Sequence, residues 1–134
     1  MKPNIWGPSA WKFLHTITLN YPDNPTKEDK LHYKTFFNTL ENVLPCDVCR
    51  LHYSKNIKEL PIRLDSKDEL TKWLFDIHNK VNESINKKLF KYDDFIQIYS
   101  DLYNPDDNNK NIKLICIILF ILLVITIIYK KIRL

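Results

Sequence analysis

The chain is almost without glycine, since Gly7 is the single one among its 134 residues. Glycine-rich phosphate loops of the Rossmann and P-loop kinds need backbone positions that only glycine tolerates. Their absence excludes those two ways of holding a nucleotide. If the chain binds a nucleotide cofactor, it must do so with side chains carried on other structure.

Cysteine is also scarce, with three residues in all. Cys116 lies within an apolar run, where a thiol acts as a small hydrophobic group. Only Cys46 and Cys49 remain, and they form a C-x-x-C pair. The N-terminus lacks the apolar run of a signal peptide, so we expect a reducing compartment, in which such a pair is more often catalytic or metal-binding than structural.

A zinc site would need about four ligands. The four histidines could contribute, but no two of them have the i,i+4 spacing of a helical ligand pair; they are His15, His32, His52 and His78. A thioredoxin-like site would need strands, and no long strand-like alternation is present. Two readings remain open: a redox-active dithiol, or a membrane-anchored helical adaptor whose C-x-x-C serves packing or metal binding.

Helical periodicity and capping residues indicate an all-α fold, a small helical bundle. We predict five successive helices, begun by Ser9, by Thr26 and by Pro45, and then covering about Lys67–Lys87 and about Tyr92–Tyr103. The formal net charge is only +4, and part of it flanks the C-terminal apolar run. Nucleic acid is therefore not an expected partner.

The apolar run, residues 114–129, carries no charge. At 1.5 Å per residue it spans roughly 24 Å, which flanking residues and outward-reaching lysines could extend toward a ~30 Å hydrocarbon core. A buried core helix is the alternative. We predict a domain at 1–103, a polar linker at 104–112, a transmembrane helix at 113–130 and a short basic tail at 131–134. Such a single-pass C-terminal anchor would leave the domain on the cytosolic side of a membrane.

A dithiol at the start of a helix is suited to exchange, because helix N–H groups and the macrodipole favour thiolate. Nearby patterns would suit a flat cofactor: Trp11 and His15 share one helix face, as do Trp73 and Ile77, with His78 next to them. Asparagines could read a ring edge, and lysines could meet a pyrophosphate. Each of these residues also has an ordinary reading as core or as a solvated helix end.

Three segments resemble the Erv/ALR family of FAD-linked sulfhydryl oxidases: WGPSAWKFLHTITLNYP, CDVCRLHY and WLFDIHNKVNESINKK. The resemblance covers about Trp6 to Tyr103. It implies a four-helix bundle with a short fifth helix, FAD as cofactor and a homodimer. By position, it assigns FAD contacts to Trp11, His15, His52, His78, Asn79, Val81, Asn82 and Lys87, with Tyr99 beside the adenine.

The same resemblance implies that Cys46 receives the substrate dithiol and that Cys49 lies next to the flavin. Electrons would pass from the dithiol through this pair and FAD to oxygen, giving hydrogen peroxide. Many relatives have a second, shuttle cysteine pair, which this chain lacks, so its partner is a protein dithiol substrate or a small dithiol carrier protein. The minimal architecture is similar to versions of large cytoplasmic DNA viruses, which would place the anchor in a viral factory or virion membrane.

Overall fold

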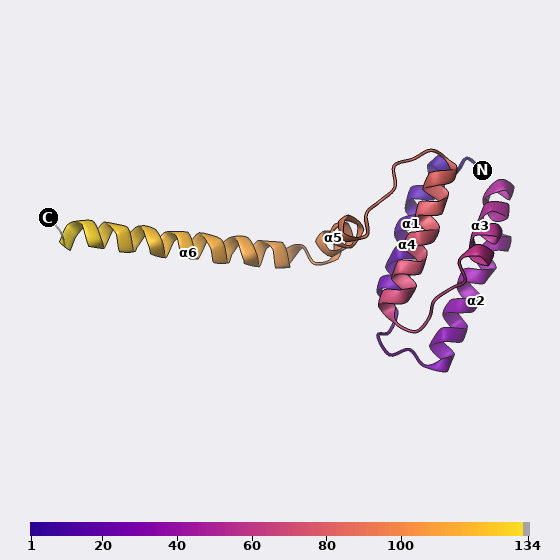
Figure 1. The fold of residues 1–134 in the computed structure, drawn as a ribbon, viewed down its shortest axis with the longest axis horizontal. Coiled ribbons are helices and arrows are strands. Elements are labelled where there is room, and N and C mark those ends of the chain that lie inside the picture. Colours follow the sequence, from indigo (N-terminus) through magenta and orange to yellow (C-terminus); the bar gives the residue numbers. More distant parts are fainter. Residues whose placement is uncertain (133–134) are drawn as a thin grey trace. The chain divides into compact units, whose positions relative to one another are not determined.

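The computed structural model describes the backbone of residues 1–132 and the side chains of 1–104, 112 and 114–129 (Figure 1). All regular secondary structure in the described residues is α-helical, which confirms the all-α character. It divides into two compact units, Met1–Phe90 and Lys91–Leu134. This division differs from the predicted domain at 1–103 in assigning the fifth helix to the second unit.

The first unit contains four helices, α1 (Pro3–Leu19), α2 (Lys27–Val43), α3 (Asp47–Glu59) and α4 (Lys67–Ser84). Figure 1 shows them as two neighbouring pairs, α1 with α4 and α2 with α3, and α3 also contacts α4. Helix α4 therefore joins the two pairs, and the residues on its different faces can meet both α1 and α3.

Capping explains where most of these helices begin. Thr26 and Asp29 form the predicted capping box of α2, and the Ser66 hydroxyl accepts the Glu69 N–H at the start of α4. The predicted start of the first helix at Ser9 is wrong, because α1 already begins at Pro3. Proline suits a first helical position, where its missing N–H would have no partner anyway, and α1 continues through Pro8.

The core of the first unit gathers around α4. Trp73 is 1% exposed and its indole N–H donates to the Leu60 carbonyl at 2.8 Å. The Tyr53 hydroxyl of α3 donates to the Phe37 carbonyl of α2 at 3.0 Å. Burying one such large side chain contributes roughly 1.5–3 kcal/mol. This packing fixes the rotation of α4 and so decides which of its polar residues face α1.

The second unit consists of α5 (Tyr92–Tyr103), at the bounds predicted, and α6 (Pro105–Ile132). The segment 104–112, predicted as a polar linker, is helical from Pro105 onward. On α5, stacked or tilted ring contacts join four aromatic residues in a row: Tyr92, Phe95, Tyr99 and Tyr103.

The predicted transmembrane helix at 113–130 is contradicted. Among the described residues, no helix is long and apolar enough to cross a membrane. The longest unbroken run of described side chains on α6 is 114–129, which at 1.5 Å per residue is roughly 24 Å against a ~30 Å hydrocarbon core. The predicted single-pass anchor and membrane localisation are corrected with it. Residues 133 and 134 of the predicted basic tail lie outside the described residues.

Candidate functional site

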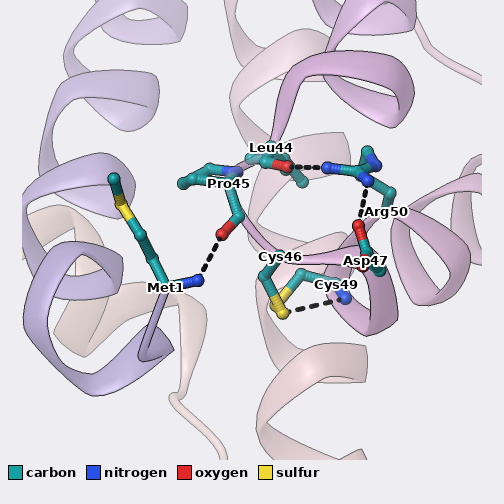
Figure 2. Close-up of polar contacts among 7 residues, drawn as sticks. All are labelled: Met1, Leu44, Pro45, Cys46, Asp47, Cys49 and Arg50. Carbon is teal, nitrogen blue, oxygen red and sulfur yellow. Dashed lines mark hydrogen bonds and ion pairs between the residues drawn. A yellow bond between two sulfur atoms is a disulfide. The ribbon is translucent and has the colours of Figure 1, made fainter.

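Cys46 and Cys49 form a disulfide at the start of α3, with their Cα atoms 5.1 Å apart (Figure 2). Cys46 is the N-cap of the helix, and its sulfur accepts the N–H of Cys49 at 3.3 Å. Both residues are half-buried. The third helix, predicted to begin at Pro45, thus begins two residues later, at Asp47. The Cys49 N–H, one of the first free N–H groups of α3, points toward the Cys46 sulfur, where it would favour a thiolate.

The turn before Cys46 is held by a residue that the sequence reasoning missed. Arg50 donates from Nη1 to the Leu44 carbonyl at 2.7 Å and pairs through Nη2 with the Asp47 carboxylate (Figure 2). The amino group of Met1 donates to the Pro45 carbonyl at 3.1 Å. For the Arg50–Asp47 pair, the sequence did contain a signal, because an arginine three residues after an acid at a helix start can reach it.

A second group of predicted residues meets where α1 packs on α4. The rings of Trp11 and His78 are stacked, with centroids 3.9 Å apart and planes 7° apart. His15 Nε2 and His78 Nδ1 lie 3.0 Å apart in a hydrogen bond. This cluster brings together residues that are 63 positions apart in the chain. It offers a flat aromatic surface with ring nitrogens at its edge.

Both histidines of the cluster are held in the neutral state. Burial lowers the pKa of His15 to about 3, with a further contribution from His78. Burial also lowers the pKa of His78 to about 4, and the positive charge of Lys87 acts in the same direction. At neutral pH, one ring therefore donates its N–H to the bare nitrogen of the other.

The segment after α4 is folded back onto that helix by two asparagines. The Asn79 side chain donates to the Phe90 carbonyl and accepts the Phe90 N–H, both at 3.0 Å. The Asn82 carbonyl accepts the Lys87 N–H at 2.8 Å, and Asn86 adopts a left-handed φ of 53°. The Phe90 ring then packs edge-on against His78, with centroids 5.5 Å apart. The amide of Asn79, predicted to contact FAD, is engaged here with backbone.

The remaining predicted contacts are carried by α3, by α4 and the segment after it, and by α5 of the second unit. His52 is exposed on α3, Val81 is half-buried on α4, and the Lys87 side chain is exposed. Tyr99 belongs to the second unit, where its ring packs against Phe95 and Tyr103. Among the described residues, no three His, Cys, Asp or Glu side chains are grouped so as to hold a metal ion.

The structure also contains features that fit FAD. The stacked Trp11 and His78 rings provide a flat surface for an aromatic ring system, and the two histidines bring no positive charge to it. The Trp6 indole N–H is buried and has no hydrogen-bond partner among the described residues, so it could donate to an acceptor on a bound molecule. Lys87 and Lys88 are exposed cations suited to phosphate oxygens.

An all-helical bundle with a C-x-x-C disulfide at a helix start and an aromatic–histidine cluster defines a helical thiol-redox protein. A sequence model of the Erv1/Alr family matches residues 8–100. The chain therefore belongs to the Erv1/Alr family.

Individual relatives agree. A probable FAD-linked sulfhydryl oxidase of Acanthamoeba polyphaga mimivirus is 43% identical over 108 residues, which cover 78% of this chain and 76% of that protein. The FAD-linked sulfhydryl oxidase of an African swine fever virus isolate is 30% identical over 94 residues, covering 70% and 79%. The crystal structure of the FAD binding domain of Erv1 from Saccharomyces cerevisiae superposes with a TM-score of 0.66 at 34% identity, covering 68% and 87%.

These matches confirm the family predicted from the three sequence segments. They also confirm the prediction of an FAD-linked sulfhydryl oxidase, and with it FAD as the cofactor. The matches establish the class of reaction and the cofactor. The roles of the individual residues stay predictions.

Proposed function

We propose that this chain oxidises pairs of protein cysteine thiols to disulfides through its Cys46–Cys49 pair, with FAD as cofactor and oxygen as final electron acceptor. The observation that carries the proposal is the disulfide at the N-terminus of α3, in a chain of the Erv1/Alr family. A half-buried disulfide at a helix N-terminus is accessible to a substrate thiolate, and the helix N-terminus favours the thiolate that forms when the disulfide opens.

The reaction at the disulfide proceeds by thiol–disulfide exchange. A substrate thiolate attacks Cys46 Sγ, the Cys46–Cys49 bond breaks, and Cys49 leaves as a thiolate. The second substrate thiolate then attacks the substrate sulfur of the mixed disulfide and releases Cys46. The substrate has lost two electrons and two protons, and the enzyme pair is a dithiol. When bound, FAD supplies the two-electron acceptor that returns this pair to the disulfide and passes the electrons to oxygen, giving hydrogen peroxide.

The cofactor is proposed to lie against the cluster formed by α1 and α4. The Trp11 and His78 rings offer it a stacking surface, and the neutral His15–His78 pair can bond at its edge. The Lys87 side chain, which is exposed, is proposed to neutralise phosphate charge. The other residues proposed as contacts, on the strength of the family motifs, are His52, Asn79, Val81, Asn82 and Tyr99.

The substrate and the assembly are finer parts of the proposal. The proposed substrate is a protein dithiol that reaches Cys46 directly, or a small dithiol carrier protein. A homodimer is supported by large apolar side chains exposed on the first two helices, among them Ile5 and Phe13 on α1 and Leu31 and Val43 on α2. Sedimentation of the purified chain would test this association.

An absorption spectrum of the purified chain tests the central claim. We expect flavin bands that bleach when dithiothreitol is added without oxygen and that return when air is admitted, with peroxide formed. Cys46→Ser and Cys49→Ser should keep the flavin bands and lose the bleaching by dithiol. A colourless protein that cannot be loaded with FAD would refute the proposal and favour a helical adaptor. A flavoprotein bleached equally well in both serine variants would refute the role of the cysteine pair.

A further inference from the structure

Only three residues connect α2 to the disulfide-bearing helix, and they form a tight turn. The Leu44 carbonyl, at the end of α2, accepts the N–H of Cys46 at 2.8 Å. Pro45 lies between them and has no N–H of its own to add. The direction in which Cys46 presents its sulfur therefore depends on how firmly the Leu44 carbonyl is held.

Arg50 is a second donor to that carbonyl, at 2.7 Å. Its guanidinium bonds Leu44 on one branch and Asp47 on the other, so it joins the end of α2 to the first turn of α3 (Figure 2). The Asp47 side chain is 89% exposed, and an ion pair with so exposed a partner contributes little by itself. The bond to the Leu44 carbonyl is the one that restrains the turn.

We propose that Arg50 is a positioning residue that keeps Cys46 within reach of Cys49 while their disulfide opens and closes. The inference rests on the proposed function, in which a substrate thiolate attacks Cys46. In the oxidised enzyme, the disulfide itself fixes Cys46 to Cys49 in α3. This covalent bond is absent in the mixed disulfide and in the dithiol. The contacts that remain are the backbone bonds of Cys46 with the Arg50 N–H and the Leu44 carbonyl, the Cys49 N–H on sulfur, the Met1 amino group on the Pro45 carbonyl, and the bond from the Arg50 guanidinium to the Leu44 carbonyl.

The physical consequence concerns ring closure. Re-forming a disulfide requires the two sulfurs to meet within a narrow range of distances and angles. If the turn at residues 44–46 samples more conformations, the effective concentration of the Cys46 thiol at Cys49 is lower. Without the guanidinium, we expect the equilibrium between Cys46–Cys49 disulfide and dithiol to move toward the dithiol. We expect the constant to change about tenfold, a factor that corresponds to ~1.4 kcal/mol and lies just below the range of about 1.5–3 kcal/mol for one hydrogen bond to a charged group.

The test uses the FAD-loaded full chain in glutathione buffers of graded composition, with thiols trapped by alkylation and counted by mass spectrometry. Arg50→Gln should lower the disulfide-to-dithiol constant about tenfold, whereas Asp47→Asn, which leaves the Leu44 bond in place, should change it by no more than about twofold. Arg63→Gln is the matched control, because the Arg63 side chain has an exposure similar to that of Arg50 and also pairs with an aspartate, Asp76, but follows α3 rather than lying in its first turn.

The direction of the change separates positioning from charge. If Arg50 acted only by its positive charge on a thiolate, its removal would destabilise the reduced form and raise the constant. A rise in Arg50→Gln, or a value equal to that of Arg63→Gln, overturns the inference. Should Arg50→Gln fail to fold, Arg50→Lys is measured instead, since a lysine lacks the planar fork that spans both acceptors. We expect a fall of about threefold there, and an unchanged constant overturns the inference.

A second measurement keeps this inference apart from the proposed function. Anaerobic reduction of the bound flavin by dithiothreitol should be slower in Arg50→Gln, whereas reoxidation of the flavin by oxygen should match the wild type. If the wild-type flavin is not reduced by dithiol, or is still reduced in Cys46→Ser, the proposed function fails. If both behave as proposed and Arg50→Gln reduces its flavin at the rate of Arg63→Gln, only the positioning role fails.

Discussion

Acid should destabilise this fold well above the pH at which its carboxylates titrate, because of the His15–His78 pair. In the unfolded chain both histidines bind a proton below a pKa of about 6.5. In the folded chain, burial keeps the pKa of His15 at about 3 and that of His78 at about 4. The unfolded state thus binds more protons at mildly acidic pH, and stability rises with pH in that window. The contribution of the two neutral histidines to the free energy of unfolding is fully present above pH 6.5, and it is lost as the pH falls toward their pKa values in the folded chain.

The magnitude follows from those shifts. At pH 5 each histidine favours the unfolded state by about 2 kcal/mol relative to pH 8, since it is protonated there and neutral in the fold. His15 is 1% exposed and counts nearly in full, whereas His78 is less deeply buried and is screened more by solvent. We therefore expect the free energy of unfolding to fall by about 3 kcal/mol between pH 8 and pH 5, a large share of a small domain's stability.

Urea unfolding at pH 8, 6.5 and 5, at constant ionic strength and with FAD in fixed excess, measures this slope. This pH range lies above the one in which Asp29 and Glu59 change the slope. Hydrogen bonds and charged partners lower the pKa values of these two carboxyl groups, so the stability that they contribute to the fold is lost only in stronger acid. The double variant His15→Asn with His78→Asn should lose most of the slope, and His52→Asn, at an exposed position, should retain it. A double variant that destabilises with acid as steeply as the wild type would refute the reasoning.

Three further substitutions test the packing around the site. Asn79→Ala removes both bonds to the Phe90 backbone and should weaken FAD binding about tenfold in a fluorescence titration; unchanged affinity would mean that the segment after α4 does not shape the cofactor site. Tyr53→Phe removes the hydroxyl that bonds the Phe37 carbonyl and should cost about 1 kcal/mol in urea unfolding, a loss that would be absent if that bond contributed nothing. Leu74→Ala, at a fully buried position, should cost about 2–5 kcal/mol by the same assay, and a cost below ~1 kcal/mol would contradict the assigned core.

Local signals in the sequence were sufficient for much of the fold. Capping residues at Thr26 and Ser66 lie within three positions of the groups they bond, so the starts of α2 and α4 could be read directly. The C-x-x-C pair likewise meets within one helical turn. The start of α1 could not be read in this way, because Pro3 and Ser9 are both acceptable beginnings and the choice between them depends on what the extra turns pack against.

By itself, the sequence determined the all-helical character, the dithiol and the family motifs, because each depends on residues close together in the chain or on an ordered set of short patterns. Only the tertiary structure decided the rest. The packing of α1 on α4 brings His15 to His78, and the fold of the segment after α4 commits Asn79 to the Phe90 backbone. The C-terminal end of α2 lies close enough to α3 for Arg50 to bond the Leu44 carbonyl. Such contacts depend on how elements distant in sequence rotate against one another, which no periodicity encodes.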